Sequence, residues 1–209
     1  MDLGKPRKLS KKEDALECFV ERMYRELDII RVYLYDMQDF FVTKQALIED
    51  EIKEEDPYIK YSLLQQPNYQ LYDKIFNDLV YKNIFVSLVS KLEISLIKLI
   101  EELGNQQLIS EKFVKPRKAI IRNTNKYLEK KLNIQNNIEK IEFYILIRNS
   151  IIHNNSFVNN KIKEDSNYKD FVNYVVFKGD VFYFESLEYP LCLLREIGSY
   201  FQEIRNKVS

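Results

Sequence analysis

The sequence predicts an all-α protein, a four-to-five-helix up-down bundle with two long N-terminal helices and a small β-hairpin before the last helix. Apolar residues recur every three or four positions along most of the 209 residues, which is the period of an amphipathic helix. Only 4 glycines and 5 prolines interrupt the chain, so long elements are expected. The length predicts a single helical domain over residues 1–209.

The first helix is expected to begin at a capping box. Ser10 and Glu13 have the spacing at which two side chains satisfy the free backbone N–H groups of a helix start. Helical spacing of apolar residues then continues to about Ile52. An acidic run at 49–56 and the following Pro57 end the pattern. These signals predict one uninterrupted helix from 10 to about 52.

A connector and a second long helix follow. Residues 57–69 predict an ordered connector whose aromatic anchors are Tyr58, Tyr61 and Tyr69. Dense apolar positions then predict a helix over about 71–103, which Gly104-Asn105 terminates. Because its apolar residues are the most closely spaced in the chain, we expect this helix at the centre of the bundle.

Three more helices are expected in the second half. Pro116 suits the first turn of a helix that ends near Leu132. A further helix spans about 137–153, with Asn154-Asn155 as its C-terminal cap, and the last helix spans about 187–207.

The segment 156–186 is expected to be a mobile loop followed by a β-hairpin insertion. Residues 156–170 are polar and rich in Asn and Lys, which is typical of a loop. The period then changes to that of strands at 174–177 and 181–184, around a tight turn at Gly179. An isolated hairpin is only marginally stable, so this one should pack on the helices.

Composition excludes several classes of function. The chain has 32 basic and 32 acidic residues, and this zero net charge does not favour a protein that wraps nucleic acid. The most apolar stretch, 83–100, is broken by three charged residues, so no membrane span is expected. No secretory signal is recognisable, which predicts a cytoplasmic location. Cys18 and Cys192 are expected to be buried free thiols, and scattered carboxylates predict no metal or cofactor.

The residues with the clearest chemical potential lie at the end of the helix over 137–153. His153 is the only histidine, and Arg148 and Asn149 precede it by five and four residues. Arg148 has helical spacing from Ile141, Ile145 and Ile152, so it is expected on a buried face, where a charge needs a partner or an interface. Asn149 and His153 share the neighbouring face, where the amide can orient the imidazole.

These three residue types suit cleavage of a phosphodiester. Histidine exchanges protons near neutral pH, so it can deprotonate a ribose 2′-OH or protonate a leaving 5′-oxygen. A guanidinium donates paired hydrogen bonds to phosphate oxygens as negative charge builds. One Arg148 and one His153 are too few for both proton transfers, whereas a two-fold dimer supplies two of each. The alternative is that His153 is a structural residue at a helix end.

The string Arg-Asn-x-x-x-His, from Arg148 through Asn149 to His153, resembles the R-x(4–6)-H motif of the HEPN superfamily of prokaryotic ribonucleases and RNA-binding domains. The resemblance implies a helical homodimer with both motifs in one cleft. It also implies metal-independent RNA cleavage that leaves a 2′,3′-cyclic phosphate and a 5′-hydroxyl. Arg148 would bind phosphate, His153 would be the general acid/base, and Asn149 would be the polar residue that often follows the arginine.

The same resemblance implies a biological setting. Members commonly act as toxins, abortive-infection factors or antiviral effectors, so an antitoxin or defence-system partner protein is expected. In members paired with a nucleotidyltransferase antitoxin, a tyrosine often stands two positions after the histidine. That position is Asn155 here, which argues against regulation by tyrosine modification. The superfamily also contains members that have lost catalysis.

Other side chains are candidates for RNA contact. A basic ridge recurs every four residues at Lys118, Arg122, Lys126 and Lys130. It can grip an RNA backbone, but a solvated helix face is the interpretation we favour. The aromatic residues near the motif are Tyr144, Phe157 and Tyr168, which can stack on bases, although core or dimer-interface positions are favoured.

The sequence therefore predicts a metal-independent endoribonuclease of toxin or antiphage-defence type, cutting RNA by 2′-OH attack at a composite dimer-interface site. The alternative is a non-catalytic module of the same kind that senses RNA or docks to a partner protein. RNA and a second copy of the chain are the expected partners.

Overall fold

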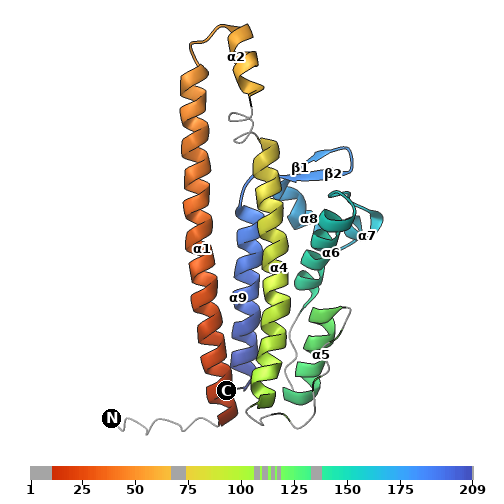
Figure 1. The fold of residues 1–209 in the computed structure, drawn as a ribbon. Helices are drawn as coiled ribbons and strands as arrows, with labels where there is room; N and C mark the ends of the chain where they lie inside the picture. The colour runs from red at the N-terminus through yellow and green to blue at the C-terminus, as the bar shows by residue number, and fades with distance from the viewer. Residues whose placement is uncertain are drawn as a thin grey trace, which may run out of the picture. The chain divides into compact units, whose positions relative to one another are not determined.

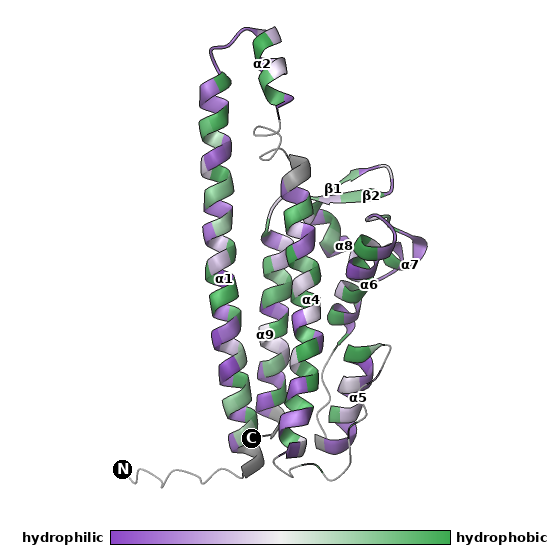
Figure 2. Cartoon of the chain, viewed as in Figure 1, coloured by the Kyte–Doolittle hydropathy of each residue, from purple (hydrophilic) through white to green (hydrophobic). Residues whose placement is uncertain are grey.

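The computed structural model describes residues 11–66, 74–105, 109, 113, 116, 119–132 and 138–208. These ranges contain eight α-helices and one two-stranded antiparallel sheet (Figure 1). The chain is mostly helical and its hairpin precedes the last helix, as predicted. Hydrophobic and hydrophilic residues alternate along the helices, as amphipathic elements require (Figure 2).

The elements follow in the order α1 (Lys11–Ile52), α2 (Pro57–Leu64), α4 (Lys74–Asn105), α5 (Ile120–Leu132), α6 (Glu139–His153), α7 (Asn160–Lys163), α8 (Tyr168–Phe171), β1 (Val175–Lys178), β2 (Val181–Phe184) and α9 (Glu188–Val208). A 3-10 turn, Val172–Tyr174, joins α8 to β1. The two long helices, α6, the last helix and both strands confirm the predicted elements to within a few residues. The capping box at Ser10 lies outside the described residues.

The chain packs as two compact units, each assembled from separate stretches. The first contains Met1–Leu27, Ser90–Ile138 and Glu196–Ser209, and the second contains Asp28–Val89 and Glu139–Arg195. Helices α1, α4 and α9 each contribute residues to both units. The single domain over 1–209 stays a prediction.

The first unit packs segments of α1, α4, α5 and α9 around an apolar core. The Phe19 and Phe201 rings lie 5.9 Å apart and join α1 to α9. The Tyr200 hydroxyl donates to Asn125 Oδ1 at 2.6 Å, which joins α9 to α5. The Tyr24 hydroxyl donates to the carbonyl of Gly198 at 2.9 Å. These two hydrogen bonds and the ring contact thus help to fix how the helical segments pack.

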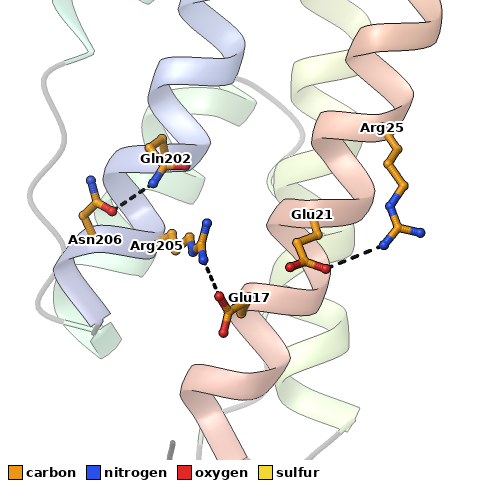
Figure 3. A network of polar contacts seen from close by, with 6 residues as sticks. All are labelled: Glu17, Glu21, Arg25, Gln202, Arg205 and Asn206. Atoms are coloured by element: carbon orange, nitrogen blue, oxygen red, sulfur yellow. Dashed lines mark hydrogen bonds and ion pairs between the residues drawn. The ribbon is translucent and has the colours of Figure 1, made fainter. Parts of the chain in front are cut away.

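Polar contacts lie at the surface of α1 and α9 in this unit (Figure 3). The Arg205 guanidinium pairs with the Glu17 carboxylate and links the two helices. Gln202 Nε2 donates to Asn206 Oδ1 at 2.9 Å within α9. Because such surface pairs are solvated, each contributes on the order of 1 kcal/mol or less.

The second unit has an aromatic core. Phe85 of α4 stacks on Tyr189 of α9 with ring centroids 5.5 Å apart, and it also contacts Tyr144 of α6 and Phe184 of β2. Phe171 of α8 packs edge-on against Phe182 and Tyr189 at 5.1 Å. The core therefore joins α4, α6, α8, α9 and the hairpin around a set of rings.

The hairpin confirms the predicted turn and, to within one residue, both predicted strands. Val176 pairs with Tyr183 and Lys178 with Val181. Gly179 has a φ of 63°, a left-handed conformation that glycine adopts without steric cost. This sheet is the packed insertion that the sequence predicted.

Two expected connections are helical instead. Pro57 begins α2, because the Asp56 side chain accepts a hydrogen bond from the backbone N–H of Tyr58 at 2.8 Å and caps the helix. The predicted anchors are wrong, since Tyr58 is 88% and Tyr61 is 69% exposed. Tyr69 lies outside the described residues.

The segment 156–170, predicted to be a loop, contains α7 and part of α8. The Asn159 side chain caps α7, and the side chains of Val158 and Ile162 are buried in the core, as is that of Phe171 directly after the segment. The prediction of a loop rested on the polar composition of the segment, in which apolar residues are few. A few well-placed apolar side chains are enough to order such a short segment.

Three further predictions are wrong in detail. Helix α5 begins at Ile120, after Ala119 with a φ of 48°, so Pro116 precedes the helix. Cys18 is exposed, because it lies across α1 from the buried Leu16. Leu79, one of the dense apolar positions that predicted the second long helix, is 55% exposed. Both cysteines are free, as predicted.

Within the described ranges, no helix combines the length and apolar character that crossing a membrane requires.

Candidate functional site

The C-terminal end of α6, in the second unit, carries all three predicted catalytic residues. Arg148 and Asn149 are half-buried, and His153, the last residue of the helix, is exposed. Arg148 Nη1 donates to Asn149 Oδ1 at 3.1 Å. The amide that was expected to orient the imidazole therefore holds the guanidinium, and the imidazole faces solvent.

Arg148 lies at the edge of the buried face of α6. That face consists of Ile141, Phe143, Tyr144, Ile147 and Ser150. The predicted apolar stripe around Arg148 is buried only at Ile141, since Ile145 is half-buried and Ile152 is 44% exposed. The face is rotated because Tyr144 and Phe143 pack into the aromatic core. Arg148 is therefore half-buried, and the Nε atom of its guanidinium is buried.

The backbone after His153 turns sharply. Asn155 and Ser156 have φ values of 48° and 64°, so two consecutive residues are left-handed. The carbonyl of Ser150 accepts hydrogen bonds from the N–H groups of Asn154 and Ser156, both at 3.0 Å. The predicted cap is confirmed at Asn155, a residue type that tolerates the left-handed region.

The segment after this turn is fastened to the hairpin. Phe182 N–H donates to the Ser156 carbonyl at 3.1 Å, and Val158 N–H donates to the Asp180 carbonyl at 2.8 Å. Lys163 pairs with Asp180 at 2.7 Å, and this hydrogen bond raises the pKa of Lys163. The segment that follows α6 is therefore held by backbone hydrogen bonds to the hairpin, which fixes the position of His153.

A buried ion pair that the sequence analysis missed fixes the hairpin. Lys82 and Asp78, four residues apart on α4, pair at 2.7 Å. Lys82 Nζ also donates to the Phe182 carbonyl at 2.9 Å, and the Phe184 N–H donates to Asp78 Oδ1 at 2.6 Å. An acid and a base four apart on an otherwise apolar helix were the available signal. The pair therefore anchors β2, the strand that is hydrogen-bonded to the segment after His153.

The predicted RNA-binding residues belong to the other unit. Arg122, Lys126 and Lys130 are exposed along α5 in the first unit, and Lys118 lies outside the described residues. An exposed basic ridge fits a solvated helix face and also fits contact with a phosphate backbone.

The aromatic candidates have different environments. Tyr144 is 2% exposed and contacts Phe85 and Tyr189, so it is a core residue, as favoured. Phe157 is 44% exposed and Tyr168 is half-buried. Of the three, Phe157 is the most accessible to a base.

Comparison with known proteins identifies no relative. No protein family matches the chain, and no curated protein or solved structure is similar to it. Across the described part of the chain, no three His, Cys, Asp or Glu side chains gather in a group suited to a metal ion.

Proposed function

We propose that the protein is a metal-independent endoribonuclease of toxin or antiphage-defence type that acts in the cytoplasm as a homodimer. The observation that carries the proposal is the end of α6, where Asn149 holds Arg148 and the imidazole of His153 is exposed a few residues further on. A cation and a proton-transfer group on one helix end are the two functions that cleavage of RNA by its own 2′-OH requires.

Each subunit carries out one of the two proton transfers. The imidazole of one His153 removes the proton from the ribose 2′-OH, whose oxygen then attacks phosphorus. The bond from phosphorus to the 5′-oxygen breaks, and the second His153, protonated, gives its proton to that oxygen. The products are a 2′,3′-cyclic phosphate and a 5′-hydroxyl. Arg148 binds the phosphate oxygens that gain charge in the transition state.

The surface around His153 supports a dimer at this position. Ile152 and Phe157, on either side of the imidazole in sequence, are each 44% exposed. Apolar side chains that are exposed beside the imidazole in one subunit would be buried in such an interface. The up-down bundle of four to five helices belongs to the same proposal, as does RNA-backbone contact by the ridge at Arg122, Lys126 and Lys130.

The test is cleavage of single-stranded RNA by the purified protein in EDTA. His153→Ala and Arg148→Ala should each reduce the rate by about 100-fold or more, because each removes an indispensable group. Asn154→Ala is the matched control, since Asn154 is also exposed at the end of α6 and should retain the activity. Undiminished cleavage by His153→Ala overturns the proposal.

A second candidate is the non-catalytic module that docks to a partner protein. Tyr33, Phe40 and Leu47 are 62%, 50% and 57% exposed, and their seven-residue spacing places them on one face of α1. An exposed apolar stripe of this kind favours contact with another protein. Inactivity on RNA, together with loss of antitoxin or effector binding in Phe40→Glu and full binding in His153→Ala, would favour this candidate.

A further inference from the structure

The second unit contains a pocket of about 420 Å³ between α1, α4 and the hairpin. Its lining includes Phe41 and Gln45 of α1, Asn77 and Tyr81 of α4, and Tyr183 of β2. The volume lies in the range of small-molecule sites, and the mixture of aromatic and amide side chains is also typical of them. Neither Arg148 nor His153 lines it.

An unsatisfied acceptor marks one wall of the pocket. The Oδ1 atom of Asn77 is buried, and no hydrogen-bond donor reaches it from the described residues. A buried carbonyl without a donor costs on the order of 1–3 kcal/mol, so such atoms usually have a partner. Since Asn77 lines the pocket, a ligand that carries an N–H group would supply that partner.

Aromatic side chains provide surfaces for a flat ligand. The rings of Phe41 and Tyr81 lie 6.4 Å apart and edge-on, and Tyr183 and Phe184 complete the aromatic lining. Burial raises the pKa of Tyr81, so its hydroxyl remains a donor at any physiological pH. Gln45 adds an amide with both donors and acceptors. A planar nitrogen heterocycle matches this combination of stacking surfaces and amides.

The hairpin side of the pocket carries charge. Lys178 lines it, with Nζ 5.2 Å from the Tyr183 ring centroid, and Glu185 and Ser186 lie on the same lining. An ammonium group binds a phosphate as a point charge, and a carboxylate accepts hydrogen bonds from ribose hydroxyls. The polar groups on this side are therefore those that a sugar and a phosphate require.

We propose that this pocket binds a nucleotide, with the base on Phe41 and Tyr81, a base N–H on Asn77 Oδ1, and the phosphate on Lys178. The site goes beyond the proposed function, because it shares no residue with the end of α6. The nucleotide is either a free mononucleotide or one residue of an RNA strand, and both present the same base, ribose and phosphate.

The test is calorimetric titration with the four ribonucleoside 5′-monophosphates, the corresponding nucleosides and a short single-stranded RNA. At least one monophosphate should bind the wild-type protein and His153→Ala equally, or the RNA should bind His153→Ala, which is not expected to cleave it. Asn77→Leu should weaken binding by about tenfold, because it removes the acceptor at similar volume. Asn83→Leu, on the exposed face of the same helix, should bind as the wild type. Lys178→Met should weaken binding of the monophosphate and leave binding of the corresponding nucleoside unchanged.

The outcomes distinguish a free nucleotide from one residue of an RNA strand. Binding of a monophosphate identifies a free nucleotide as sufficient, and binding of RNA alone identifies a strand. Asn77→Leu should not lower the melting temperature, since it removes an unsatisfied carbonyl. If it fails to fold, Val42→Trp serves instead, because Val42 is 60% exposed on the pocket lining and a large ring there blocks entry. Absence of binding by all probes, or unchanged binding by the pocket variant, overturns the proposal.

Discussion

Lys82 Nζ lies 2.7 Å from Asp78 Oδ2, and the two side chains are only 10% and 8% exposed. The same two groups bind the Phe182 carbonyl and the Phe184 N–H, which face away from strand β1. The ion pair thereby satisfies the outer edge of a two-stranded sheet that would otherwise present free backbone groups. The hairpin in turn holds the segment that follows His153.

Breaking this pair should strongly destabilise the second unit. Asp78→Ala leaves the Lys82 ammonium buried without its counter-ion and the Phe184 N–H without an acceptor. We expect a loss of about 3–5 kcal/mol in the free energy of unfolding. Urea denaturation followed by circular dichroism measures it.

The exposed pair between Asp28 and Arg31, 3.0 Å apart on α1, is the matched control. Asp28→Ala should cost less than about 1 kcal/mol, because the pair is solvated. The double variant Asp78→Leu/Lys82→Met should be more stable than Asp78→Ala, because it leaves no unpaired charge. An Asp78→Ala variant as stable as the Asp28→Ala control would contradict the anchoring role.

The left-handed turn after α6 should be sensitive to the residue at 155. Asn155→Val places a β-branched side chain at a φ of 48°, which should cost about 1–2 kcal/mol. Asn155→Gly should be neutral or slightly stabilising, since glycine adopts this conformation freely. Thermal denaturation of the two variants measures the difference. Equal stability of both would show that the turn does not constrain the end of α6.

Stability should fall at alkaline pH because of Tyr189. Burial, reinforced by nearby Tyr144, raises the pKa of Tyr189 well above its ordinary value of 10.0. The neutral phenol is favoured in the folded state, so its contribution is complete below about pH 10 and is lost as the pH rises from there through the folded-state pKa. Denaturation between pH 9 and about 11 should show a shallower decline for Tyr189→Phe than for the wild type. Identical slopes would contradict this assignment.

The parts of the fold that local signals specify were predictable. The apolar period of α1 continues without glycine or proline, so its end at Ile52 could be read from the sequence. The position of His153 at the end of α6, and the cap at Asn155, follow from the same kind of signal. Helix α2 is also encoded locally, in the Asp56-Pro57 start, although the nearby tyrosines favoured an ordered connector.

The remaining features depend on partners distant in the chain. Lys82 meets a carbonyl 100 residues away, and no local pattern specifies that contact. The exposure of Ile152 depends on which face of α6 the aromatic core selects. The pocket around Asn77 combines three separate elements, so its unsatisfied acceptor could not be recognised before those elements were placed.

If the end of α6 directs cleavage of RNA by the 2′-OH of the RNA, as we propose, the chemistry of the RNA ends is the most direct measurement. Fragments made by the wild-type protein in EDTA should carry a 2′,3′-cyclic phosphate and a 5′-hydroxyl, which mass spectrometry identifies. Fragments that carry a 3′-hydroxyl and a 5′-phosphate, or intact RNA after prolonged incubation, would contradict the claim.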